Sequence, residues 1–413
     1  MRRRVVVTGL GMISPLGNDV ASNWEALSSG RSGITRITLF DTTGFSVDIA
    51  GEVKGFEPLT YVDRKDLRRM DRNVQYAVGA ATQAVADSRL CIKSESAEAV
   101  GVVYGTAIGG LKTTLDNQKI LEEKGPSRVS PFYLQNLIPD TASGQVAIST
   151  GAQGPNMAIV SACATGGHSL GEAAETIRRN DADVMIAGGT EACVVPLVVA
   201  GFTVMRALAS GANGPEQACR PFDRTREGFV MAEGSGCVIL EELEHARQRD
   251  AYIYAELIGY GSSNDAYDLA APVEKGEGIA RAMRMALRKG GVDPSEIDYV
   301  NAHGTGTPLN DKFETAGVKS VFGDHAYRLA MTSTKSMTGH MMGAAGAIEA
   351  IACILAIVNG VIPPTLNYRY PDPECDLDCV PNVARATPVR VATSNSMGLG
   401  GHNSSLIFRA FSD

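Results

Sequence analysis

Cys163 stands where a nucleophile could best be activated. The apolar run IVSA leads directly into it, and the following ATGG opens a helical pattern over 166–179. A thiol between a buried strand and a helix meets the positive end of the helix dipole and unpaired backbone N–H groups. Both favour a thiolate, and the N–H groups can stabilise an oxyanion. The alternative is a small buried cysteine at a tight turn, because free cysteines are commonly buried.

Two further segments place basic side chains in glycine- and threonine-rich loops. The first is NAHGTGTP, which contains His303, and the second is STKSMTGH, which contains Lys335 and His340. Loops after strands are the ordinary location of catalytic groups in α/β proteins. A single histidine in such a loop is more often structural than catalytic. Two histidines, a lysine and an elbow cysteine together predict an active site.

The elements that must position these groups follow an α/β alternation. Short β-branched runs predict buried strands at 5–9, 99–105, 158–161, 184–189, 255–259, 299–302, 329–333 and 391–394. Single apolar stripes predict sheet-covering helices at 73–88, 166–179 and 277–289. The charged segment 241–251 is expected to be a surface helix.

The two ends of this pattern resemble each other weakly. VVVTGLG near the start is similar to AELIGYG at 255–261, and each half leads later to a reactive-looking helix or loop. We interpret this as a duplication with its joint near residue 250, which gives an N-terminal half over 1–250 and a C-terminal half over 251–413. Chance similarity between two strand-and-glycine turns is the alternative.

Composition excludes several classes of function. The 413 residues contain 38 Lys plus Arg and 46 Asp plus Glu, which gives a net charge of −8. Sequence-independent electrostatic binding to nucleic acid is therefore not expected. The longest apolar run, 350–358, is far shorter than the ~20 residues that span a bilayer. The eight cysteines form no CxxC pair, which predicts reduced thiols in the cytoplasm and no zinc site. The GLGMIS segment lacks the third glycine of a dinucleotide loop.

Four motifs together identify a resemblance to a family. ACATGG, NAHGTGTP, STKSMTGHMMGAAGAIEA and GLGGHNSSL occur in the order and at the spacing of the β-ketoacyl-acyl carrier protein synthases. The resemblance covers essentially the whole chain. It implies an α/β fold that is thiolase-like, with five αβαβα layers, two pseudo-symmetric halves and assembly as a homodimer. It also implies decarboxylating condensation of an acyl thioester with malonyl-acyl carrier protein in fatty acid elongation.

The resemblance also implies roles for individual residues. Cys163 would accept the acyl chain, with oxyanion donors from its own N–H and that of Leu399. His303 and His340 would bind the malonyl thioester oxygen as CO2 leaves, a step that needs donors where charge develops. Lys335 with Glu349 would orient the site. Thr305 and Thr307 would contact the phosphopantetheine arm that carries the substrates, and no other cofactor or metal is implied. The acyl pocket would contain Ile108, Cys193 and Phe202.

A basic stretch at 63–72 has two interpretations. It contains five basic and three acidic residues, and the ordinary interpretation is a solvated helix with internal ion pairs. The resemblance instead implies a docking surface for the acidic acyl carrier protein. The residues implied are Lys65, Arg68, Arg69, Arg128 and Arg206.

The late loop departs from the family pattern. Where the family usually reads NSFGFGG, this chain has Met397 and Leu399 in place of two aromatic residues. The ring that resembles a gate over the acyl pocket is absent, so selectivity for chain length and branching is the property most affected. A ketosynthase of a polyketide or other specialised pathway therefore stays open.

Other classes fit the residues less well. A non-catalytic chain-length subunit would be expected to lack the thiol of Cys163, and a thiolase would need a second cysteine within 394–403, which has none. A thiol hydrolase using Cys163, His303 and Asn301 satisfies the residue types of a triad. It leaves His340 and Lys335 without roles.

Overall fold

The structure is a computed structural model that describes residues 3–93 and 96–412. The described residues form a ten-stranded mixed sheet in the order β5-β4-β6-β7-β1-β8-β14-β13-β9-β10. The strands of its first half are β1 (Val5–Ile13), β4 (Val100–Gly105), β5 (Asn156–Met157), β6 (Val184–Glu191) and β7 (Gly234–Glu242). Those of its second half are β8 (Ala255–Asn264), β9 (Tyr299–Asn301), β10 (Ala330–Thr332), β13 (Val391–Gly398) and β14 (His402–Arg409).

Both halves of the sheet have the same topology. When the described sheet strands are numbered within their own half, each half reads 3-2-4-5-1 from its edge to the centre of the sheet. The two first strands, β1 and β8, meet there as a short antiparallel pair. A shared strand order supports a duplication over a chance similarity of two short segments. The division at residues 250 and 251 stays a prediction.

Helices cover and separate the two halves, which gives the five αβαβα layers. α3 (Arg72–Ser88) packs on β1, β7 and β6, and α10 (Glu277–Gly290) packs on β8 and β14 as outer layers. α7 (Thr165–Arg178) and α13 (Ala345–Asn359) pack against each other and against strands of both halves, so they form the middle layer. The helices expected at 73–88, 166–179 and 277–289 are therefore confirmed.

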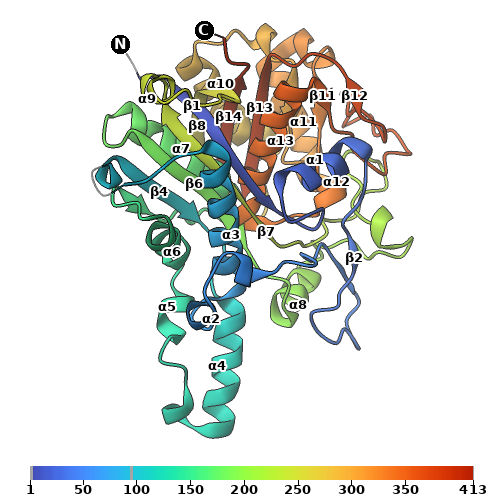
Figure 1. The fold of residues 1–413 in the computed structure, drawn as a ribbon. Coiled ribbons are helices and arrows are strands. Elements are labelled where there is room, and N and C mark those ends of the chain that lie inside the picture. Colours follow the sequence, from blue (N-terminus) through green and yellow to red (C-terminus); the bar gives the residue numbers. More distant parts are fainter. Residues whose placement is uncertain (1–2, 94–95, 413) are drawn as a thin grey trace.

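The remaining elements lie around this core. Two small sheets pair β2 (Thr35–Arg36) with β3 (Ile49–Ala50) and β11 (Val361–Ile362) with β12 (Arg385–Ala386). The other helices are α1 (Val20–Ser29), α2 (Arg64–Leu67), α4 (Leu111–Lys124), α5 (Tyr133–Leu137), α6 (Thr141–Thr150), α8 (Pro196–Val204), α9 (Leu243–Gln248), α11 (Pro308–Phe322) and α12 (Lys335–Thr338). α4 and α5 project from the body (Figure 1).

Two elements differ from the sequence expectation. The run 158–161 forms no strand, because β5 ends at Met157 and Val160 is 53% exposed beyond it at the edge of the sheet. The expected helix over 241–251 is shorter, since β7 continues to Glu242 and α9 covers only Leu243–Gln248. Glu241 is fully buried and holds Arg249 through two hydrogen bonds of 2.7 Å, so the charged segment is anchored to the core.

The middle layer is apolar enough to invite confusion with a membrane span. Met342–Asn359 is long and apolar enough to cross a bilayer, but 89% of it is buried inside the protein. It approaches α7 very closely. A Cβ on Gly166 would lie 2.5 Å from the backbone nitrogen of Ala347, so only glycine permits this contact.

Candidate active site

A pocket of about 380 Å³ gathers residues from distant parts of the chain. It contains nine of the residues singled out from the sequence: Cys163, Phe202, Arg206, His303, Thr305, Thr307, His340, Met397 and Leu399. Lys335 and Glu349 lie outside its lining and are buried, at 1% and 2% exposure. The three motif loops and the late glycine loop therefore meet at one place.

Cys163 lies in a 3-10 turn, Ala162–Ala164, that leads directly into α7. Ala162 has a left-handed φ of 51°, an unfavourable conformation for a residue with a side chain. The second half repeats this device, because Met342 with φ 44° opens the turn Met342–Ala344 before α13. The sulfur atoms of Cys163 and Met342 lie 3.9 Å apart, so the two equivalent turns face each other across the site.

The late glycine loop brings a backbone donor to the sulfur. A Cβ on Gly398 would lie 2.7 Å from the carbonyl oxygen of Ser161 and 3.1 Å from the nitrogen of Cys163, so glycine is needed for this approach. The next residue, Leu399, hydrogen-bonds through its backbone N–H to the Cys163 thiol. The N–H groups of Cys163 and Leu399 are thus on hand for an oxyanion beside the sulfur.

The thiol itself is not ionised at rest. Burial raises the pKa of Cys163 to about 11, although the charge of Lys335 and the N–H of Leu399 lower it. The sequence led us to expect that the helix terminus would favour a thiolate. In the structure, the loss of hydration in a pocket where the thiol is 8% exposed outweighs the favourable charges.

The two imidazoles stand edge to face, with ring centroids 5.2 Å apart. Lys335 Nζ lies 3.4 Å from Nδ1 of His303. Because an ammonium group can only donate, Nδ1 must accept, and the ring proton of His303 is on Nε2. Burial, followed by the charge of Lys335, lowers the pKa values of His303 and His340 well below their usual range. Both rings are therefore neutral donors.

The ammonium group is held by a buried partner. Lys335 forms an ion pair with Glu349 of α13. Burial raises the pKa of Glu349 to about 7, and the charge of Lys335 opposes this rise. Removing one partner of such a buried pair usually costs about 3–5 kcal/mol, because the other charge is left uncompensated.

Two contacts of the histidines were not predicted from the sequence. Glu314 of α11 accepts the backbone N–H groups of His303 and Gly304, both at 2.8 Å. The ring of Phe229 meets His340 edge to face at 5.3 Å. Glu314 follows its loop closely along the chain, but no pattern shows that a charged residue of α11 turns inward. Phe229 reaches the site only through tertiary packing.

The residues expected to form the acyl pocket lie behind the sulfur. Cys193 belongs to one apolar cluster with Cys163 and Met342, against which Ile108 and Phe202 pack. An acyl chain attached to the sulfur would find this cluster next to it. Their role as the acyl pocket stays a prediction.

The expected docking residues are all exposed. Lys65 lies in α2 and Arg68 and Arg69 follow it, Arg128 lies in a short turn after α4, and Arg206 reaches the pocket. Arg72, in contrast, is drawn inward to an ion pair with Glu233. The basic stretch therefore divides into a structural arginine and a set of solvent-facing cations. Docking itself stays a prediction.

A thiol, two neutral imidazoles and two oxyanion donors in a duplicated αβαβα fold define a condensing enzyme of the thiolase class. Models of the β-ketoacyl synthase N-terminal and C-terminal domains match residues 2–246 and 254–369. The chain belongs to the β-ketoacyl synthase family.

Individual relatives extend over the full length. The chain is 50% identical over 409 residues to 3-oxoacyl-[acyl-carrier-protein] synthase 2 of Staphylococcus aureus (strain COL), covering 99% of each chain. Among solved structures, the ishigamide ketosynthase/chain length factor matches with a TM-score of 0.93 and 39% identity. A type II polyketide acyl-carrier protein in complex with its ketosynthase matches with a TM-score of 0.92 and 35% identity. Each match covers 100% of both chains.

Alkylation of Cys163 tests the resting state of the thiol. With a pKa of about 11, only about one thousandth of the thiol is ionised at pH 8. The rate of its reaction with iodoacetamide, followed by peptide mass spectrometry, should therefore rise about tenfold per pH unit from pH 7 to pH 10. The exposed Cys91 serves as an internal reference. A rate that levels off below pH 8 would show a resting thiolate instead.

Proposed function

We propose that this protein catalyses the decarboxylating Claisen condensation of an acyl thioester with malonyl-acyl carrier protein, the elongation step of fatty acid biosynthesis. The observation that carries this proposal is the convergence of Cys163, His303 and His340 in one pocket with the Leu399 N–H at the sulfur. The 50% identity to a 3-oxoacyl-[acyl-carrier-protein] synthase 2 supports it.

The first half-reaction transfers the acyl group to the enzyme. The Cys163 sulfur attacks the thioester carbonyl carbon, and its proton leaves with the departing pantetheine thiol. The tetrahedral oxyanion accepts hydrogen bonds from the N–H groups of Cys163 and Leu399. Because the resting thiol is protonated, ionisation must accompany substrate binding. That requirement suits an enzyme whose thiol should not react with other electrophiles.

The second half-reaction forms the carbon–carbon bond. The carboxylate of malonyl thioester leaves as CO2, and its bonding electrons form an enolate whose oxygen accepts hydrogen bonds from His303 and His340. The enolate carbon attacks the acyl-Cys163 carbonyl, and the cysteine leaves as thiolate and takes up a proton. Nδ1 of His340 is buried without a hydrogen-bond partner among the described residues.

Acyl carrier protein is the proposed macromolecular partner. One structural relative was solved as a ketosynthase in complex with an acyl-carrier protein. Lys65, Arg68 and Arg69 offer exposed positive charge to an acidic partner although the whole chain carries −8. Thr305 and Thr307 line the pocket and are proposed to contact the arm that delivers the thioester. No further cofactor is needed, because the histidines stabilise the enolate.

We also propose a cytoplasmic homodimer. The edge strand β5 carries the exposed Met157, and Val160 and Ile148 beside it are 53% and 75% exposed. An unpaired sheet edge flanked by apolar side chains suits pairing with a second copy of the chain. The eight cysteines are all free, which suits a reducing compartment.

A specialised pathway is the second candidate, on the strength of the late loop. Leu399 is 38% exposed at the pocket and stands where the family usually has an aromatic ring. By their descriptions, one structural relative is a type II PKS acyl-carrier protein in complex with its ketosynthase, and another is a ketosynthase/chain length factor. The two candidates differ in product, so incubation with acyl- and malonyl-carrier proteins of graded chain length, followed by mass spectrometry of the products, decides between them.

Separate assays of the half-reactions test the roles of the histidines. His303→Ala and His340→Ala should each reduce CO2 release from malonyl-carrier protein by roughly 10²-fold or more, the usual cost of losing one oxyanion donor. Acylation of Cys163, measured as the protein mass shift, should fall much less. Equal losses in both assays would mean that the histidines act on the thiol as well, against the proposed division of labour.

Charge reversal tests the docking surface. Lys65→Glu, Arg68→Glu and Arg69→Glu together should raise the KM for acyl-carrier protein at least tenfold, with little change in kcat. Acylation by a short acyl-pantetheine should be unaffected. Added salt should weaken the wild type in the same way, because exposed charges are screened within about 10 Å at 0.1 M.

A control with the same change of charge makes this result specific. Arg288→Glu, Arg328→Glu and Arg390→Glu reverse three exposed arginines outside the proposed surface. This variant should keep the wild-type KM for acyl-carrier protein. If both triple variants raise KM equally, the effect is one of net charge, and 63–72 returns to its interpretation as an ordinary solvated segment.

A further inference from the structure

The segment Phe222–Phe229 runs beside the loop that carries the two pocket threonines. The N–H of Gly228 donates to the carbonyl oxygen of Gly306 at 3.0 Å. At its end, Phe229 packs against His340. One short segment therefore touches both the proposed arm-binding loop and a proposed catalytic histidine, so its position matters to the pocket.

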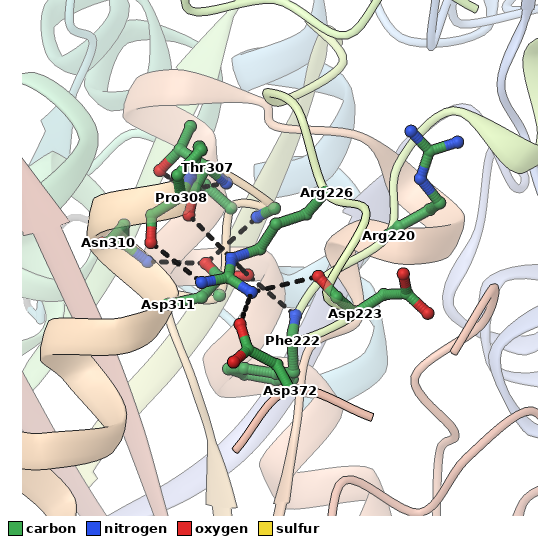
Figure 2. Close-up of polar contacts among 12 residues, drawn as sticks. Arg220, Phe222, Asp223, Arg226, Thr307, Pro308, Asn310, Asp311 and Asp372 are labelled. Atoms are coloured by element: carbon green, nitrogen blue, oxygen red, sulfur yellow. Dashed lines mark hydrogen bonds and ion pairs between the residues drawn. The ribbon is translucent and has the colours of Figure 1, made fainter. Parts of the chain in front are cut away.

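Arg226 joins this segment to the loop through its whole guanidinium group (Figure 2). Nε donates to the carbonyl oxygen of Thr307 at 3.3 Å, and Nη2 donates to that of Pro308 at 2.9 Å. Nη1 donates to the carbonyl oxygen of Asp223 at 3.0 Å and to the carboxylate of Asp372 at 2.5 Å. The guanidinium group thus binds two consecutive carbonyl oxygens of the loop, while Asp223 and Asp372 hold it in place.

Asp311 completes the attachment from the other side. It is fully buried, and its two oxygens accept the N–H of Phe222 at 2.8 Å and the N–H of Gly306 at 3.1 Å. Arg226 Nε lies 3.8 Å from this carboxylate. Burial raises the pKa of Asp311, and the charge of Arg226 lowers it. The charge of Arg226 therefore favours the ionised form of this buried carboxylate, in which both oxygens can accept.

The loop held in this way contains the two threonines. The hydroxyl groups of Thr305 and Thr307 lie 2.9 Å apart and hydrogen-bond to each other, and both residues line the pocket. The orientation of these two side chains depends on the backbone of residues 304–308. Arg226 binds the last two carbonyl oxygens of this segment. Arg226 itself is absent from the pocket lining, so it reaches substrate only through the loop.

We propose that Arg226 is a positioning residue for the pantetheine arm: its fork, anchored by Asp372, sets the orientation in which Thr305 and Thr307 meet the arm. This inference rests on the proposed function, which gives the threonines that contact. A lysine could supply the charge but not the planar fork that reaches Thr307, Pro308 and Asp372 together.

The test compares two substrates on Arg226→Lys. Acylation of Cys163 by an acyl-pantetheine, followed by mass spectrometry, should lose at least tenfold in kcat/KM, mainly through KM. Acylation by the S-ethyl thioester of the same acid, which has no arm to hold, should stay within about twofold of the wild type. Arg385→Lys is the matched control, because Arg385 also forks onto a carboxylate, that of Asp378, outside the pocket lining. It should change neither substrate.

Asp372→Asn provides a milder variant if Arg226→Lys does not fold. It keeps the volume of the side chain and removes the charge that anchors the fork, so it should lower kcat/KM for the acyl-pantetheine selectively and by a smaller factor. An equal loss on both thioesters in either variant would mean that Arg226 supports the fold alone, and the inference would be wrong.

Thr305→Val with Thr307→Val separates the inference from the proposed function. If this double variant loses the preference for the acyl-pantetheine and Arg226→Lys keeps it, the threonines bind the arm without help from Arg226. That outcome overturns the inference and leaves the proposed function standing. If neither variant loses the preference, the proposed contact of the threonines with the arm is also wrong.

Discussion

The site depends on one buried charge, the ammonium group of Lys335. Burial of a charge is costly, and Glu349 makes it tolerable by forming an ion pair within the middle layer. The ammonium then lies 3.4 Å from Nδ1 of His303 and keeps that nitrogen unprotonated, so the ring must present an N–H at Nε2. Burial, together with this charge, lowers the pKa values of His303 and His340 and so favours neutral rings. A neutral imidazole can donate a hydrogen bond to the developing enolate oxygen without transferring its proton. Decarboxylation requires such a donor where the negative charge develops.

The duplicated fold brings this charge to the nucleophile. In each half, a short turn leads into a helix of the middle layer. The first residue of that turn has a left-handed backbone, and it is Ala162 in one half and Met342 in the other. The first turn carries Cys163, whereas the second carries Gly343 at the equivalent place, where a Cβ would clash with neighbouring backbone. Close contact between α7 and α13, possible because Gly166 has no side chain, draws the two turns together. Catalytic groups from both halves therefore share one pocket.

Sequence analysis predicted the chemistry better than the details of its surroundings. Cys163, His303 and His340 stand in motifs whose residue types and flanking glycines carry a recognisable signal, and the structure brings them together. The state of the thiol was not predicted correctly, because the depth of burial is a tertiary property. The strand expected at 158–161 is absent for a similar reason, since an edge position leaves Val160 exposed. Phe229 and Arg226 act through contacts between distant segments, which no local pattern reveals. Glu314 is close to its loop in the chain, but no local pattern shows that it turns inward.

The tautomer of His303 tests this account most directly. ¹⁵N NMR of the protein labelled in its histidine side chains distinguishes a protonated Nε2 from a protonated Nδ1 and from an imidazolium ion, and His303→Asn assigns the signal. At pH 7 the account predicts a neutral ring with its proton on Nε2. A neutral ring protonated on Nδ1, or an imidazolium ion, would contradict the claim that Lys335 prepares His303 as the enolate donor.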